Sequence, residues 1–152
     1  MNKLRRVFVV SVLVIGVIGA AHAQFSRPEN AVKYRQAVML LISQHFGRIA
    51  AVIKGQSPYY RDGVVQNAVL VETLSKLPWE AFAFPGTDKG QTGLKSSAFS
   101  EPDQFKQDAG NLESATSKLA DAAKQGNLDD IKVPFGEVAK SCKSCHEKFR
   151  SQ

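Results

Sequence analysis

The amino-acid sequence predicts an all-α protein built as an antiparallel four-helix bundle. Four stretches of the chain repeat apolar residues at alternating steps of three and four, the spacing that places side chains on one helix face. Glycine, proline and polar residues separate these stretches. The strict alternation of apolar and polar residues that marks a β-strand is absent from the sequence. Four amphipathic helices of this kind are typical of a bundle with one shared core.

Residues 1–23 are predicted to be a cleaved signal peptide. They contain three basic residues near the start, followed by an apolar run and the small-x-small cleavage site Ala21-His22-Ala23. The apolar run is shorter than the ~20 residues of a typical membrane span. We therefore expect a periplasmic domain comprising residues 24–152, with no membrane association after cleavage.

The predicted cleavage halves the positive charge of the chain. It removes three of the 20 basic residues and none of the 14 acidic residues, so the formal net charge falls from +6 to +3. A nucleic-acid partner is not expected, because no basic run is interleaved with aromatic residues. A mild positive charge would favour encounter with an acidic redox partner.

The first helix is predicted from Pro28, which suits a first helical turn, to just before Gly55. Its inward seam consists of Val32, Arg35, Met39, Ile42, Phe46, Ile49 and Ile53. His45 lies off this seam, and we interpret it as a surface or flank histidine rather than a second axial ligand of the iron.

The second helix is expected to run from a capping Asp62 to about Lys76, and Pro78 stops it. Three aromatic residues follow within six positions: Trp79, Phe82 and Phe84. They either plug the core beneath a loop or form a wall for a flat cofactor. Residues 86–100 are rich in Gly, Ser and Thr and have no period, so we expect a long loop across one end of the bundle.

The third helix is predicted to begin with a cap at Ser100 and to end at Gly126. Its seam consists of Phe105, Ala109, Leu112, Thr116, Leu119 and Ala123. The seam of the fourth helix consists of Ile131, Phe135, Val138, Cys142, Cys145 and Phe149. Pro134 leaves two starts open for this helix. It either kinks a helix that begins near Leu128 or opens the main helix after a short turn.

The segment from Cys142 to His146 is a C-x-x-C-H motif, the attachment signature of a c-type haem. Steps of three and four residues place Cys142, Cys145 and His146 on one helix face. Both thiols would form thioether bonds with one haem, and His146 would bind the iron as proximal ligand. Because the cysteines occupy the core-facing seam, the bundle would enclose the covalently bound haem.

A redox-active cysteine pair or a zinc site would require features that the sequence lacks. A thioredoxin-like redox pair needs a βαβ context, and a zinc site needs more Cys or His ligands than this chain offers. A simple disulfide or a chance match would also give the spacing. The chain has 2 Cys, both inside the motif and behind an export signal, which favours haem attachment.

Three residues close to the expected haem have two interpretations each. Arg35 either pairs with a haem propionate or snorkels from the apolar seam to solvent. Met39, one turn further along, is either a core residue or a thioether ligand of the iron. Arg150 follows His146 by four residues and either lies beside the proximal imidazole or stabilises the helix dipole.

The chain resembles the cytochromes c′, the class II c-type cytochromes of bacteria, over essentially all of residues 24–152. Three motifs carry the resemblance: Gln24-Phe25 through Lys33-Tyr34-Arg35-Gln36, Leu77-Pro78-Trp79 with Phe82, and Cys142-Lys143-x-Cys145-His146-x-x-Phe149-Arg150. Class I cytochromes c carry the haem motif near the N-terminus, so its C-terminal position here separates the two classes.

The resemblance implies a left-twisted bundle, usually a homodimer formed through the first two helices, and a five-coordinate high-spin haem. It also implies haem-edge contacts for Arg35 and Gln36, a distal pocket lined by Met39 and Phe82, and Arg150 beside the proximal ligand. The sequence departs from the family pattern at two positions. Met39 replaces a common Leu, although Met also occurs there and low-spin relatives use a Met on the first helix as sixth ligand. Pro134 replaces an ordinary helix former.

Two functions follow from the resemblance. The chain would carry electrons to or from an unidentified redox partner, or would bind the diatomic gases NO and CO. If Met39 were the sixth iron ligand, the protein would be a low-spin electron carrier only. An enzyme such as a peroxidase is not expected, because no distal histidine with an acidic or arginine partner is apparent on the first helix.

Overall fold

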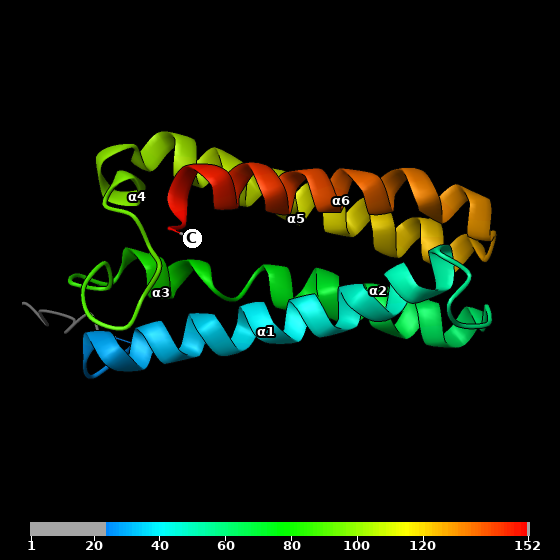
Figure 1. Cartoon of the computed structure of the whole chain (residues 1–152), viewed down its shortest axis with the longest axis horizontal. Coiled ribbons are helices and arrows are strands. Elements are labelled where there is room, and N and C mark those ends of the chain that lie inside the picture. Colours follow the sequence, from blue (N-terminus) through cyan, green and yellow to red (C-terminus); the bar gives the residue numbers. More distant parts are fainter. Residues whose placement is uncertain (1–23, 152) are drawn as a thin grey trace, which may run out of the picture.

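The computed structural model describes residues 24–151, and the predicted signal peptide lies outside them. The helices are α1 (Pro28–Ile53), α2 (Arg61–Ser75), α3 (Trp79–Ala83), α4 (Ser97–Ser100), α5 (Pro102–Gln125) and α6 (Leu128–Phe149). The four long helices run alternately up and down the long axis, with α1 and α2 in one layer and α5 and α6 in the other (Figure 1). The predicted all-α antiparallel four-helix bundle is therefore confirmed.

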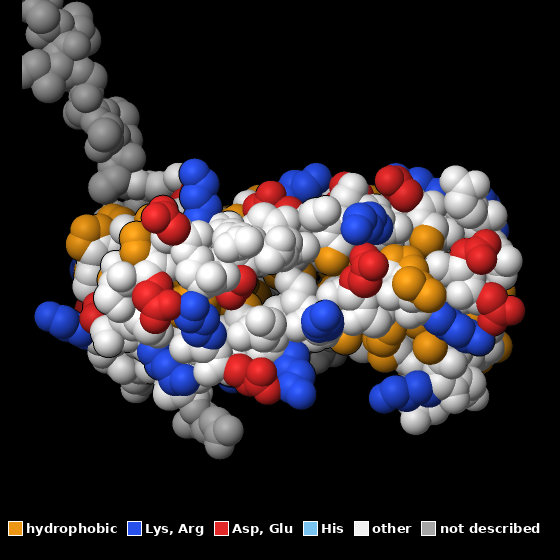
Figure 2. Space-filling view, turned by 90° about the horizontal axis from the view of Figure 1, so that it is seen from above, with side chains coloured by type: hydrophobic (Ala, Val, Ile, Leu, Met, Phe, Trp, Pro, Cys, Tyr) orange, Lys and Arg blue, Asp and Glu red, His pale blue; other side chains and the backbone are white. Residues whose placement is uncertain are grey.

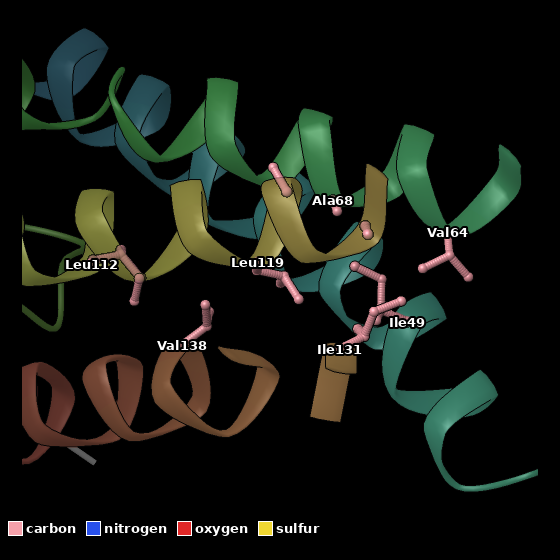
Figure 3. Packing of buried hydrophobic residues seen from close by; sticks show 10 residues of the cluster. Ile49, Val64, Ala68, Leu112, Leu119, Ile131 and Val138 are labelled. Carbon is pink, nitrogen blue, oxygen red and sulfur yellow. The ribbon is translucent and has the colours of Figure 1, made fainter. Parts of the chain in front are cut away.

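The core forms because each long helix turns an apolar stripe inward. α1 packs on α2, α2 on α5 and α5 on α6. Figure 3 shows side chains from all four helices meeting in one cluster. Its labelled members are Ile49, Val64, Ala68, Leu112, Leu119, Ile131 and Val138. Full burial of each larger aliphatic side chain contributes ~1.5–3 kcal/mol, so this cluster fixes the arrangement of the helices.

The fourth side of the bundle, between α1 and α6, is closed over only part of its length. The rings of Phe46 and Phe135 stack there, with centroids 4.2 Å apart and planes 8° from parallel. Within residues 24–151, the backbones of α1 and α6 do not otherwise pack closely. The short helices α3 and α4 and the loop between them lie at the same end of the bundle as the C-terminus (Figure 1).

Two predicted helix caps are wrong. The residue that precedes α2 is Tyr60, which makes no side-chain cap bond, and Asp62 lies inside the first turn. Contacts with the end of α5 fix this start instead: the Arg61 guanidinium donates to the Lys124 carbonyl at 2.6 Å, and the Tyr59 hydroxyl donates to the Gly126 carbonyl at 2.9 Å.

The predicted cap of α5 is wrong because the chain forms another helix there. Ser100 is the last residue of α4, so Glu101 precedes α5 and Pro102 occupies its first turn. A proline in that place is favourable because its fixed φ suits a helix start and its missing N–H would have no helical partner.

The fourth bundle helix, α6, begins at Leu128, which agrees with the first of the two predicted starts. The Asn127 side chain accepts a hydrogen bond from the backbone N–H of Asp129 at 3.0 Å and so caps α6. Pro134 therefore lies inside the helix. The glycine before the cap, Gly126, ends α5 with a φ of 82°, a left-handed conformation that a glycine adopts without strain.

Candidate functional site

A cavity of about 1140 Å³ lies between α1 and α6, at the end of the bundle that carries α3 and α4. It is slightly larger than the ~300–1,000 Å³ of typical small-molecule sites. All eight residues that the sequence singled out line this cavity: Arg35, Gln36, Met39, Phe82, Cys142, Cys145, His146 and Arg150. Residues up to 115 positions apart in the chain are thus brought to one site.

The last turns of α6 supply the two thiols and the imidazole. Because α6 is helical from Leu128 to Phe149, Cys142, Cys145 and His146 lie along one side of it, as predicted. Both thiols are free and partly buried. Burial raises the pKa of Cys142, and burial with the nearby charges of Asp108 and Cys142 raises the pKa of Cys145 to about 11.

The surroundings of His146 favour the neutral form of its imidazole. Burial lowers its pKa, and the neighbouring positive charge of Arg150 lowers it further. A neutral imidazole is the form that binds a metal ion. Two thiols and one imidazole on a single cavity wall form the set of groups that the covalent attachment of a c-type haem requires.

Arg35 lies inside the protein, with only 3% of its surface exposed. The interpretation that it snorkels to solvent is therefore wrong. Its guanidinium donates to the Thr87 carbonyl at 2.5 Å, to the Thr92 hydroxyl at 2.7 Å and to the Ala81 carbonyl at 3.4 Å. It also lies 4.6 Å from the centre of the Phe82 ring, a cation–π contact.

Arg35 forms no close ion pair with another of residues 24–151. No ion pair of the described residues includes it. Burial lowers its pKa, an effect that the charge of Asp88 partly offsets. Because a buried charge is costly without a counter-charge, the cavity beside Arg35 suits an anionic group.

Gln36 and Met39 lie on the same side of α1 as Arg35. The Gln36 amide donates to the Gln91 carbonyl at 3.1 Å, which ties α1 to the loop that follows α3. Met39 is partly buried and packs against the cluster formed by Val38, Ile42 and Val71. Its side chain thus borders both the core and the cavity.

A wall of four aromatic side chains bounds the cavity: Trp79, Phe82, Phe105 and Phe149. Neighbouring rings in this order have centroids 5.9, 5.2 and 5.2 Å apart. The predicted aromatic group is divided, however, because Phe84 packs against Phe25 instead, at 6.0 Å. Both Trp79 and Phe82 thus line the cavity, as the interpretation of a wall for a flat cofactor requires, and Trp79 also packs against the core.

One polar group on this wall has no partner in residues 24–151. The indole N–H of Trp79 is buried and unpaired there. Buried donors are almost always hydrogen-bonded, so an acceptor on a bound cofactor would satisfy it. A haem carries a flat apolar ring and two carboxylates, which suit the aromatic wall, the buried Arg35 and this donor. The residues present therefore fit a haem.

The sequence did not single out the loop residues on the cavity wall. Thr92, Gly93 and Leu94 line the cavity, and Leu94 forms an isolated antiparallel bridge with Arg150. The only signal in the sequence was the length of the loop without a period, which indicates a functional loop but no particular residue. His45, by contrast, does not line the cavity: it is half-buried, and its Nδ1 lies 2.8 Å from the Asn67 side-chain oxygen.

Comparison with known proteins identifies the family. The family model for cytochrome c′ matches residues 30–150. Cytochrome c′ from Alcaligenes xylosoxydans xylosoxydans is 42% identical over 129 residues, which cover 85% of this chain and 99% of that protein. Cytochrome c′ from Rubrivivax gelatinosus is 43% identical over 130 residues, which cover 85% of this chain and 100% of the relative.

Solved structures agree with the sequence comparison. The crystal structure of the Rubrivivax gelatinosus protein covers 84% of this chain and 100% of its own, with a TM-score of 0.80 and 43% identity. A nitric oxide complex of a variant of the Alcaligenes xylosoxidans protein covers 85% of this chain and 99% of its own, with a TM-score of 0.79 and 41% identity. A carbon-monoxide-bound variant of the same protein also matches, covering 85% of this chain and 100% of its own, with a TM-score of 0.79 and 41% identity. The chain belongs to the cytochrome c′ family.

Proposed function

We propose that the chain is a periplasmic c-type cytochrome that holds one haem c, binds the diatomic gases NO and CO, and transfers electrons, rather than an enzyme. One observation carries this proposal: the face of α6 with Cys142, Cys145 and His146 lines the same cavity as the five other predicted haem contacts. The NO complex and the CO-bound structure of relatives support the gas-binding part.

Different residues of this chain would hold different parts of the cofactor. Cys142 and Cys145 anchor it through sulfur, and His146 provides the proximal nitrogen ligand. Arg35 supplies positive charge for a carboxylate, and the buried indole N–H of Trp79 supplies a neutral donor. When bound, the haem supplies an iron centre that can exchange one electron or take up a small ligand.

The distal side is proposed to be crowded and apolar. Met39 lines the cavity from α1, and Phe82 lines it from α3. Packing of Met39 against Val38, Ile42 and Val71 supports a role as a space-filling core residue and a five-coordinate iron. A small diatomic ligand would enter where a larger one would clash. The alternative, in which Met39 is the sixth ligand and the protein only carries electrons, predicts a different optical spectrum.

The redox partner is proposed to bind through weak attraction between its surface charges and those of this protein. Figure 2 shows one face of the molecule on which Lys and Arg side chains alternate with Asp and Glu. Exposed ion pairs occur among the described residues, such as Lys118 with Glu137 at 3.5 Å. Such exposed pairs contribute little to stability. Because opposite charges are mixed, the surface keeps only a modest net charge. A transient complex with an acidic partner suits this surface.

A homodimer is proposed through the outer face of α1 and its neighbour α2. Leu41 on this face of α1 is 47% exposed and does not line the cavity. By length and composition α1 could also cross a membrane, although the core helices of globular proteins meet the same criteria. A second copy of the chain would remove this face from water.

The optical spectrum of the purified protein tests the proposed function. A five-coordinate cytochrome c′ gives a high-spin ferrous spectrum that changes on addition of NO and of CO. A low-spin spectrum with a methionine-to-iron charge-transfer band would favour the electron carrier with Met39 as ligand. A ferrous spectrum that neither gas changes would contradict gas binding, and the absence of any haem absorption would contradict the whole proposal.

A further inference from the structure

The loop between α3 and α4, residues 84–96, crosses the mouth of the cavity and is tied on both sides. On one side Arg35 and Gln36 of α1 donate to its residues Thr87, Gln91 and Thr92. On the other side the backbone N–H of Lys95 donates to the Phe149 carbonyl at 2.8 Å, next to the end of α6. These ties hold Thr92 between α1 and α6.

The hydroxyl of Thr92 has an unused proton. Its oxygen accepts from the Arg35 guanidinium at 2.7 Å and from the Leu94 backbone N–H at 3.1 Å. These two bonds occupy both lone pairs of a threonine hydroxyl, so its single O–H must donate elsewhere. Within residues 24–151 no acceptor takes this proton, and Thr92 lines the cavity.

Arg35 and Thr92 together form a pair of donors suited to an anion. Arg35 is a buried cation that forms no ion pair among the described residues, and its Nη2 lies 2.7 Å from the Thr92 hydroxyl. A hydroxyl that accepts from a cation is polarised and becomes a better donor. Hydrogen bonds to a carboxylate are stronger than those between neutral groups.

We propose that Thr92 is a positioning residue of this site, whose hydroxyl donates to a propionate carboxylate of the haem beside Arg35. This rests on the proposed function, because it requires that the cavity holds a haem. Thr92 would fix one edge of the ring from the loop, whereas the thiols of α6 fix the other side of the site. The loop would then be held in place by its hydrogen bonds to α1 and α6 and by its hydrogen bond to the cofactor.

The test compares three variants of the haem-loaded, purified protein by resonance Raman spectroscopy, which reports hydrogen bonding to haem propionates through their bending vibration. Thr92→Val removes the hydroxyl at nearly constant volume, and Thr92→Ser keeps it. Thr73→Val is the matched control, since Thr73 lies exposed on α2 and donates only to the Val69 carbonyl. Intact mass confirms the haem in each sample.

We expect a shift of the propionate vibration to lower frequency in Thr92→Val, and the wild-type frequency in Thr92→Ser and Thr73→Val. An unchanged frequency in Thr92→Val, or the same shift in Thr92→Ser, would overturn the proposal while the haem remained bound. A wild-type protein without covalently bound haem would instead overturn the proposed function as well.

A second measurement does not depend on any variant. In a crystal structure of the haem-loaded wild type, the Thr92 hydroxyl oxygen should lie within hydrogen-bond distance, ~2.5–3.0 Å, of a propionate oxygen. A propionate that bonds to Arg35 while the Thr92 hydroxyl points to a protein acceptor would overturn the proposal.

Discussion

Met39 is the residue on which the ligand chemistry of the site depends most. It borders the cavity from α1 and packs on a core cluster at the same time. Its thioether can act either as bulk that restricts access or as a ligand. These two roles predict opposite results for the same substitution.

Met39→Ala should speed the binding of CO to the ferrous protein at least about tenfold, which corresponds to ~1.4 kcal/mol of activation free energy. The physical reason is the removal of apolar bulk beside an open coordination position. The resting spin state should stay high. Stopped-flow absorbance measures the rate, and the optical spectrum reports the spin state.

Met39→Leu is the matched control, since it keeps a similar apolar volume without sulfur. Its CO-binding rate should stay near that of the wild type. A wild-type protein that is low-spin, and that becomes high-spin in both variants, would show that the thioether binds the iron and would refute the crowding role.

Arg35 shows what a single position in a sequence cannot reveal. Its place on the first seam left two interpretations open, a partner for a haem propionate or a side chain that snorkels to solvent, and its 3% exposure excludes the second. Its partners are 46, 52 and 57 residues away, in α3 and in a loop without any period. Contacts of this kind depend on the path of the loop over the bundle, so neither they nor Thr92 could be predicted.

At the scale of the element, α6 combines a cofactor-binding face with an internal proline. A proline in a helix removes one backbone hydrogen bond and its ring clashes with the carbonyl four residues before it, here that of Asp130. Lys132 and Asp129, paired at 2.6 Å, and the Asn127 cap support the first turns. The helix is therefore continuous through an unfavourable residue.

Pro134→Ala should stabilise the protein by about 1–3 kcal/mol, because a proline inside a helix costs ~3 kcal/mol relative to alanine and part of this cost is relieved by local adjustment. Urea unfolding of the haem-loaded protein, followed by far-UV circular dichroism, measures the change in the free energy of unfolding.

Val133→Ala is a suitable control for this substitution, because Val133 is the neighbouring residue on α6 and is 71% exposed. It should change stability by less than about 1 kcal/mol, the range of ordinary helix propensities. If Pro134→Ala were no more stable than this control, the proline would have to support a bend that the packing of α6 requires.

The long helices could be predicted because their seams extend over many turns, whereas the short ones could not. α3 has five residues and α4 has four, too few to show a period. They are held by tertiary contacts, such as the bond from the Ser97 hydroxyl to the Lys148 carbonyl at 3.3 Å. The predicted caps of α2 and α5 were wrong for a related reason, because contacts with neighbouring segments determine where those helices begin.

For the whole molecule, the bundle uses its four sides differently. Three sides are closed by helix packing, and the side between α1 and α6 contains the cavity. The outer face of α1 still exposes Leu41, which is 47% exposed and does not line the cavity. A dimer through this face would bury apolar surface without touching the haem site.

Leu41→Glu should weaken the dimer about 100-fold or more. In a two-fold symmetric dimer the substitution removes one buried leucine from each copy, and each loses ~1.5–3 kcal/mol of burial. Sedimentation equilibrium measures the dissociation constant, and the haem spectrum should not change. Val133→Glu, on the exposed part of α6, should leave association unaltered. A Leu41→Glu protein that stays as dimeric as the wild type would place the interface elsewhere.

The intact mass of the mature protein tests the central claim most directly. The claim is that Cys142 and Cys145 bond a haem that the four helices enclose. In a host with a working cytochrome-maturation system, the purified chain of residues 24–152 should carry the added mass of one haem and have no thiol that reacts with an alkylating agent. A colourless protein with the mass of the bare polypeptide and two reactive thiols would contradict the account.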